Sequence, residues 1–152
     1  MFSDDLKTEL EAIRDRFPGH IKAALVPVLR RVQADRGWLD AECQAWVAEF
    51  LGITAIEVHE VATFYPMLYT TPVGKHVIHV CRTLSCDVCG ARELWKHLTD
   101  KLGVDRNGTT ADGKFTLKSA ECLASSGTAP VLLIDNERHE NLSLDEVDKL
   151  LE

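Results

Sequence analysis

The sequence has no hydrophobic run long enough to cross a bilayer, and positive charge is scarce. Its 152 residues include 17 lysines and arginines against 24 acidic residues, which gives a net charge of −7. We therefore expect no direct membrane insertion. We also expect no binding to nucleic acid, because its phosphates would repel an acidic chain. A G-x-G-x-x-G fingerprint is missing as well, so we expect no dinucleotide to bind to this chain alone.

The N-terminal stretch does not resemble a signal peptide. It reads MFSDDLKTELEAIRDRF, which is acidic and has the apolar spacing of a helix. We therefore expect a cytoplasmic protein. In a reducing compartment, cysteines serve metal or redox chemistry more often than structural disulfides.

The hydrophobic pattern changes period near residue 72. Residues 1–72 show helical spacing in four segments, with capping signals at Asp40, Gly52 and the Thr54–Glu57 pair. Beyond them, the pattern predicts strands at 75–80, 113–121, 129–135 and near 137–142, and helices at 90–103 and 143–151. Ser143 and Glu146 have the spacing of a capping box at the start of the last helix. The sequence therefore predicts an α+β chain: a four-helix unit over 1–72, then a thioredoxin-like domain over 73–152.

Three of the five cysteines lie close together. Cys81, Cys86 and Cys89 fall within nine residues, in HVCRTLSCDVCG. They flank the predicted start of a helix, where exposed N–H groups stabilise thiolates and anionic clusters. Cys122 follows the next predicted strand, in a loop that can face the first one. Cys43 lies within an amphipathic helix, and we interpret it as a buried small hydrophobic residue.

Three kinds of chemistry compete for this cysteine loop. A thiol–disulfide exchanger would need only the C-x-x-C pair Cys86 and Cys89. Structural zinc usually takes two tight pairs, and the second pair is missing. A [2Fe–2S] cluster takes two ligands per iron from facing loops, which the C-x4-C spacing of Cys81 and Cys86 fits. Spacing alone leaves zinc and the cluster as alternatives.

Four longer segments are distinctive: RGWL, EVATFYPMLYTTPVGKHVIHVC, DGKFTL and ECLASSGTAPVLLIDNERHENLS. Together they resemble the E subunit (24-kilodalton type) of NADH:quinone oxidoreductase, respiratory complex I, from about Phe17 to the end of the chain. The resemblance implies a thioredoxin-like ferredoxin domain with one [2Fe–2S] cluster. It also implies an electron-transfer subunit of an oxidoreductase, with no complete active site of its own.

The same resemblance implies a partner and a location. The partner is the subunit that carries FMN and binds NADH, and residues 1–72, which have no chemistry of their own, are expected to dock on it. The location is the cytoplasm, or the inner face of an energy-transducing membrane as a peripheral part of a complex. Related subunits serve NAD-linked hydrogenases and formate dehydrogenases, which is an alternative assignment.

The resemblance also implies the ligand set, with one departure. Cys81, Cys86, Cys122 and the residue at position 126 are expected to hold the cluster. The family reads ECLGAC where this chain reads ECLASS, so Ser126 stands in place of the fourth cysteine. Three outcomes are open: Ser126 ligates through its oxygen, Cys89 substitutes for it, or no cluster binds and the chain is a redox-silent structural subunit.

Overall fold

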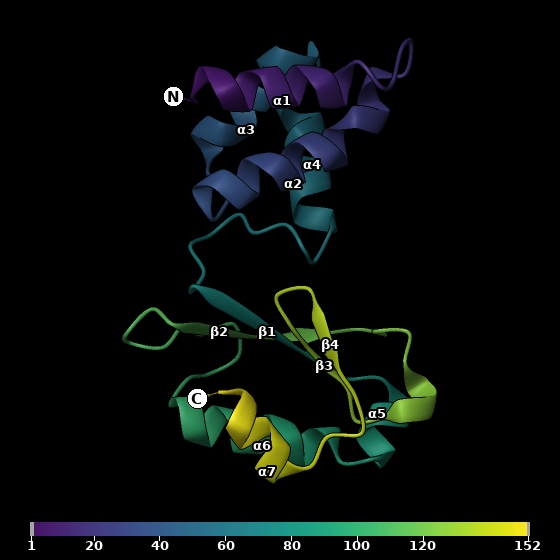
Figure 1. Ribbon diagram of the computed structural model, residues 1–152, viewed down its shortest axis with the longest axis vertical. Helices are drawn as coiled ribbons and strands as arrows, with labels where there is room; N and C mark the ends of the chain where they lie inside the picture. The colour runs from purple at the N-terminus through teal and green to yellow at the C-terminus, as the bar shows by residue number, and fades with distance from the viewer. Residues whose placement is uncertain (1, 152) are drawn as a thin grey trace. The chain divides into compact units, whose positions relative to one another are not determined.

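The computed structural model describes residues 2–151 (Figure 1). The chain forms two compact units, Met1–Pro72 and Val73–Glu152, and each is described by itself. Helices build the first unit, and the second contains a four-stranded sheet with helices. Within the described part of the chain, no helix is both long enough and apolar enough to cross a bilayer.

Capping residues set the ends of the helices in the first unit. The helices are α1 (Asp4–Arg14), the 3-10 helix η1 (Ile21–Ala24), α2 (Leu25–Arg36), α3 (Ala41–Leu51) and α4 (Ala55–Phe64). Asp40 caps the start of α3, and Gly52, in the left-handed conformation, caps its end. Thr54 and Glu57 form a capping box at the start of α4. These predicted caps are confirmed, whereas the helical stripe extended to Phe17 and α1 ends earlier, at Arg14.

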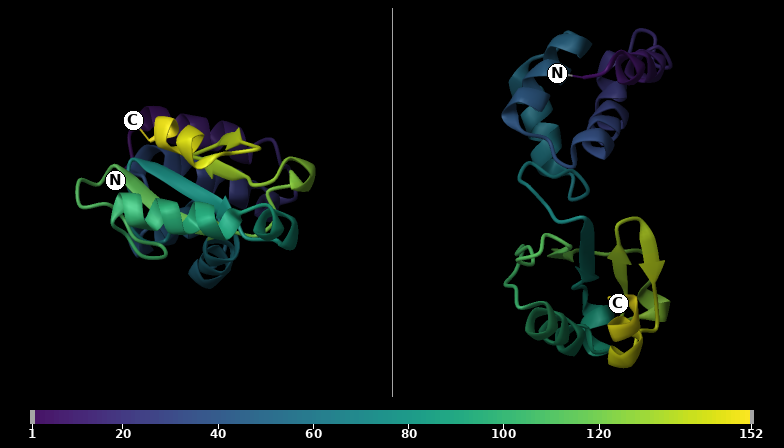
Figure 2. Two further views of the ribbon diagram at one scale, coloured as in Figure 1. Left: turned by 90° about the horizontal axis from the view of Figure 1, so that it is seen from below. Right: turned by 60° about the vertical axis from the view of Figure 1, so that its left-hand side comes forward.

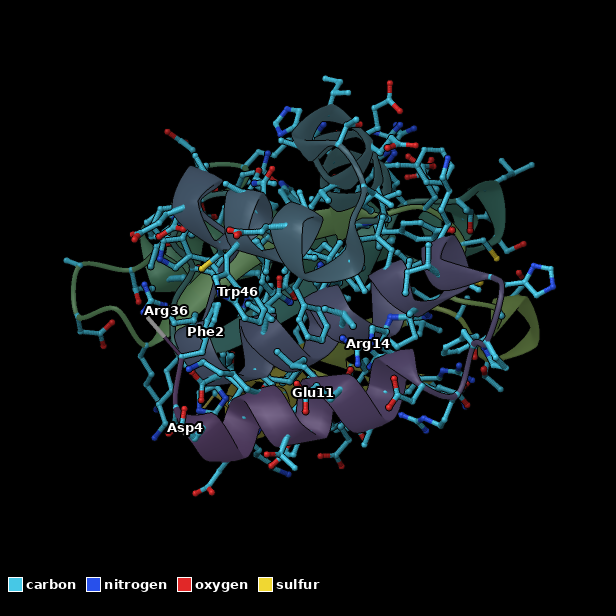
Figure 3. All side chains as sticks on the ribbon, turned by 90° about the horizontal axis from the view of Figure 1, so that it is seen from above. Phe2, Asp4, Glu11, Arg14, Arg36 and Trp46 are labelled. Atoms are coloured by element: carbon cyan, nitrogen blue, oxygen red, sulfur yellow. The ribbon has the colours of Figure 1, made fainter. Side chains whose placement is uncertain are left out.

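Aromatic and cationic side chains of this unit form a row, in which Arg36, Phe2, Trp46 and Arg14 are labelled in Figure 3. The Phe2 ring meets Trp46 edge-on at 4.6 Å, and Trp46 stacks on Phe50 at 5.1 Å. Arg36 lies over Phe2 and Arg14 lies over Phe50, so that a cation closes each end of the row. The row is continuous with the apolar core of the unit, to which the buried Phe2 belongs and whose fully buried members include Leu10, Val28, Leu29, Val32 and Val47. Cys43 is fully buried there, as predicted.

The sheet of the second unit combines one parallel and two antiparallel pairings. Its strands are β1 (His76–Cys81), β2 (Phe115–Ala120), β3 (Leu132–Ile134) and β4 (Glu137–His139), in the order β2-β1-β3-β4. β1 runs parallel to β2, with Cys81 opposite Ala120 at their carboxyl ends. β3 runs antiparallel to both β1 and β4. The parallel pair therefore brings the loops that follow β1 and β2 to the same edge of the sheet.

Helices α6 (Ala91–Leu102) and α7 (Leu144–Leu150) cover one face of this sheet (Figure 2, left). Between helices and sheet lies a second apolar core, which includes Ile78, Leu94, Leu98, Leu117 and Leu132. α7 begins with the predicted capping box of Ser143 and Glu146. The predicted α+β class is confirmed, and so is the predicted succession of strands and longer helices along the chain.

The sequence did not predict the short helix α5 (Leu84–Val88), which lies in the first cysteine loop. This helix has five residues, of which Cys86 is buried while Leu84 and Val88 are 78% and 79% exposed. It therefore lacks the stripe of core-facing apolar residues by which helices are found in a sequence. The 3-10 helix η2 (Ser126–Thr128), in the second cysteine loop, was missed for the same reason.

Candidate metal centre

The first cysteine loop begins where β1 ends. Cys81 is the last residue of β1, and its N–H donates to the carbonyl of Val131 at 3.1 Å. The chain then turns through Thr83 into α5, which carries Cys86 inward. Both thiols are buried, with 2% and 1% of the residue exposed, in a small apolar cluster with Ala91 and Val131. Strand pairing and helix packing thus hold this pair of sulfurs in place before any ligand binds.

The two buried thiols influence each other. Burial alone would raise the pKa of Cys81, but hydrogen bonds from the Thr83 hydroxyl and N–H, from Cys86 and from the Leu123 N–H outweigh it. The pKa of Cys81 therefore lies below its ordinary value. The pKa of Cys86 is raised, first by burial and then by the neighbouring sulfur, although the Val131 N–H acts in the opposite direction.

The second cysteine loop begins where β2 ends. Cys122 is exposed, and its sulfur accepts a hydrogen bond from the Ala124 N–H at 3.3 Å. Ala124 adopts a φ of 59°, the left-handed conformation that favours glycine. Ser125 donates to the carboxylate of Glu140 at 2.5 Å, which ties the loop to the residue after β4. Ser126 begins η2, and its side chain is exposed.

The two loops meet at the edge of the sheet (Figure 1). Leu123 packs against the buried cluster that contains Cys81 and Cys86. A backbone hydrogen bond from Leu123 contributes to lowering the pKa of Cys81, and α5 lies against η2. A backbone donor from the second loop thus serves a thiol of the first.

The cysteines differ sharply in their surroundings. Cys81 and Cys86 lie together and are buried, whereas Cys122 is exposed at the neighbouring loop. Cys89 ends α5 and is also exposed. Among residues 2–151, no three Cys, His, Asp or Glu side chains are grouped closely enough to hold a metal ion. The structure therefore brings one pair of the predicted ligands together, and it leaves Cys122, Ser126 and Cys89 outside that pair.

The donor types suit a [2Fe–2S] cluster. Such a cluster takes soft thiolate ligands, and N–H groups directed at its sulfurs stabilise its negative charge. The first loop offers two buried thiols with such donors, and the second offers an exposed thiol and a hydroxyl in C-x3-S spacing. By donor type these residues suit the group, and of them the structure brings Cys81 and Cys86 together.

Sequence reasoning missed the residues that support these donors. Thr83, Leu123 and Val131 direct donors at the buried sulfurs, and Ala124 makes the turn of the second loop. Backbone N–H groups leave no mark in a sequence. The one available signal was at Ala124, because the corresponding residue of the resembled motif is glycine.

Comparisons with known proteins agree with this arrangement. A profile of the thioredoxin-like [2Fe-2S] ferredoxin family matches residues 10–152. NADH-quinone oxidoreductase subunit 2 of Thermus thermophilus is 42% identical over 137 residues, which cover 90% of this chain and 76% of that protein. The E 2 subunit of the NADH-quinone oxidoreductase of Rhizobium meliloti is 37% identical over 147 residues, which cover 97% and 87% respectively.

A solved structure extends the similarity of fold. An NAD+-reducing [NiFe]-hydrogenase in the air-oxidized state matches 81% of this chain with a TM-score of 0.70 and 24% sequence identity. The match spans 22% of the hydrogenase chain, so the likeness concerns one part of a longer protein. The matches to the profile and to the relatives run over most of the sequence, from the helical unit to the last helix. The chain belongs to the thioredoxin-like [2Fe-2S] ferredoxin family, and it is similar to the E subunits of NADH-quinone oxidoreductase.

Proposed function

We propose that this chain is the electron-transfer E subunit of a complex-I-type NADH dehydrogenase. In this role it holds a [2Fe–2S] cluster close to the FMN of the partner subunit that binds NADH. The observation that carries the proposal is the meeting of the two cysteine loops at the carboxyl ends of the parallel strands β1 and β2. The names of the relatives, which are subunits of NADH-quinone oxidoreductase, support the choice of enzyme.

Each loop has a separate task in this proposal. Cys81 and Cys86 supply two thiolates from the buried side, and Cys122 and Ser126 supply a thiolate and an oxygen from the exposed side. The bound cluster supplies one-electron chemistry, since it accepts and releases a single electron at a time. The chain's own residues exclude water from the first pair and direct N–H groups at its sulfurs. The partner is expected to face the exposed second loop.

Ser126 is our proposed fourth ligand, and Cys89 is the alternative. Ser126 lies in the second loop, four residues after Cys122, at the position where the resembled motif has its fourth thiol. Cys89 is the C-cap residue of α5, the helix that contains Cys86. Moving Cys89 to the iron held by Cys122 would require α5 to shift, although that helix is anchored by the burial of Cys86. The existing backbone therefore favours Ser126.

The helical unit supplies the docking surface for the flavin-containing partner. Three large apolar side chains of this unit, Ile56, Phe64 and Met67, are exposed by 61%, 76% and 45%. Burying such side chains against a partner is favourable. We expect Phe64→Asp to weaken co-purification with the FMN subunit, while Leu144→Asp, a matched change in the second unit, should have little effect. Equal binding of the FMN subunit by wild type, Phe64→Asp and Leu144→Asp would contradict this docking role.

Iron analysis tests the proposal directly. Full-length protein, reconstituted anaerobically with iron and sulfide, should contain two irons per chain, the number that defines the cluster type. It should also absorb visible light and give an EPR signal after reduction with dithionite. Protein without iron after this treatment would instead support the redox-silent structural subunit, the alternative that Ser126 and the exposed Cys122 favour. Co-purification with a hydrogenase instead of a quinone reductase would change the enzyme assigned and leave the cluster role intact.

A further inference from the structure

Thr83 occupies a helix-capping position without capping the helix. It precedes α5 with extended backbone angles, φ −73° and ψ 162°, as N-cap residues do, but its side chain makes no capping hydrogen bond. Four other helices of the chain do use their caps: Ser3, Asp40, Thr54 and Ser143 each accept a backbone N–H of the first helical turn. Thr54 is the same residue type at the same kind of position. The hydroxyl of Thr83 is therefore engaged elsewhere.

That hydroxyl lies against the buried sulfurs. The Thr83 Oγ1 atom is 3.3 Å from the Cys81 Sγ atom. A hydrogen bond from the same hydroxyl also lowers the pKa of Cys86, although burial raises it more strongly. A thiolate has no proton to donate. Once Cys81 is deprotonated, the hydroxyl must therefore be the donor. The side chain is partly buried, so competition from water is reduced.

We propose that Thr83 is a positioning residue that tunes the reduction potential of the cluster by donating an O–H···S hydrogen bond to Cys81. The inference rests on the proposed function, because it assigns a role toward the cluster that Cys81 would help to hold. Reduction adds one electron, delivered by reduced flavin in the proposed complex or by dithionite in the test. The hydroxyl keeps its proton throughout. The added negative charge strengthens a hydrogen bond to the ligand sulfur, so the bond favours the reduced form.

The size of the effect follows from a single hydrogen bond. Removing one such bond commonly changes an equilibrium constant by about fivefold. For a one-electron couple this corresponds to a fall in midpoint potential of about 40 mV. Thr83→Val removes the hydroxyl and keeps the branched shape, whereas Thr83→Ser keeps the hydroxyl. Because the hydroxyl does not cap α5, Thr83→Val should lower the melting temperature only slightly, through the loss of its one hydrogen bond to Cys81.

The test is a dithionite titration of full-length, reconstituted protein, followed by EPR, for wild type, Thr83→Val and Thr83→Ser. A control is Thr99→Val, which removes a hydroxyl that donates to the Lys96 carbonyl on α6. We expect equal iron content in all four proteins, a lower midpoint potential in Thr83→Val, and values close to wild type in Thr83→Ser and Thr99→Val.

Two results would overturn the role of Thr83 while the proposed function stands. One is an unchanged midpoint potential in Thr83→Val with full iron content. The other is a failure of Thr83→Val, and of no other variant, to bind iron. The hydroxyl would then be needed for assembly of the cluster and would not be shown to set its reduction potential. Absence of iron from the wild type as well would refute the proposed function and, with it, this inference.

Discussion

The two cysteine loops leave neighbouring parallel strands at the same edge of the sheet, but they differ in almost every other respect. The first loop buries Cys81 and Cys86 and surrounds them with hydrogen-bond donors. The second leaves Cys122 and Ser126 exposed and turns through an alanine in the left-handed region. The difference indicates that one half of the candidate site is organised by the protein core, while the other half depends on a few surface contacts and on the ligand itself.

The largest expected effect comes from removing a thiol of either loop. Cys81→Ala and Cys122→Ala should each abolish the visible absorption of the reconstituted protein, because each removes a ligand that no neighbouring group replaces. Cys43→Ala, a buried cysteine of the first unit, is the matched control and should keep the spectrum. Retention of full absorption by Cys122→Ala would show that the second loop does not contribute to the site.

A smaller effect is expected from exchanging the donor at position 126. Ser126→Cys replaces a hard oxygen with a thiolate that delocalises charge better and loses its proton more readily. The cluster should become easier to reduce and should survive to lower pH, as measured by EPR titration and by absorption after acid exposure.

The matched variant for this exchange is Cys89→Ala. If Ser126 is the ligand, Cys89→Ala should keep its iron and Ser126→Ala should lose much of it. If Cys89 substitutes for the serine, the iron contents of these two variants are reversed. Their comparison therefore decides between the first loop and the second as the source of the fourth donor.

The turn of the second loop offers a test by stability alone. Ala124 has a φ of 59°, a conformation that is unfavourable for a residue with a Cβ atom. Ala124→Gly should raise the free energy of unfolding of the metal-free protein by about 0.5–1 kcal/mol. Ala45→Gly, at an exposed position within α3, should lower it by a similar amount. Denaturant unfolding of both variants measures the difference, and a destabilising Ala124→Gly would contradict strain at this turn.

The smallest effect concerns acid. Hydrogen bonds from Ser125 and Thr128 lower the pKa of Glu140. A carboxyl whose pKa is lower in the folded state adds stability above its unfolded pKa and loses that contribution as the pH falls. We therefore expect the amide hydrogens of the second loop to lose protection, measured against their intrinsic exchange rates, below about pH 4.5, while the first loop stays protected. Glu140→Gln should remove this pH dependence, and identical behaviour of both loops in acid would contradict it.

Much of this arrangement could be predicted from the sequence. Spacing marked Cys81, Cys86 and Cys122 as candidates, and the resemblance to the subunit family added Ser126. Capping signals located Asp40, Thr54 and Ser143. Apolar periodicity predicted the order of strands and helices, because burial in a core imposes that period. These features depend on neighbours along the chain, and a sequence displays such neighbours directly.

The remaining features depend on contacts between distant segments. The diversion of the Thr83 hydroxyl from its cap to a sulfur follows from the burial of Cys81, which requires the completed sheet. Leu123 packs against the cluster that contains Cys81 only because β1 and β2 pair in parallel. Exposure of Cys122 likewise depends on the path of the loop after β2. Periodicity and capping rules contain no information about contacts between segments that are far apart in the sequence.

The parallel pairing of β1 with β2 also has a consequence for the order of folding. Helical segments of the first unit form contacts between near neighbours, which close quickly, whereas β1 must wait for a partner strand beyond α5 and α6. Cys81 and Cys122 therefore approach each other only after that long-range ladder has formed. We expect iron and sulfide to be incorporated late, into chains whose sheet is already complete, so that loading with cofactor would act as a check on correct folding.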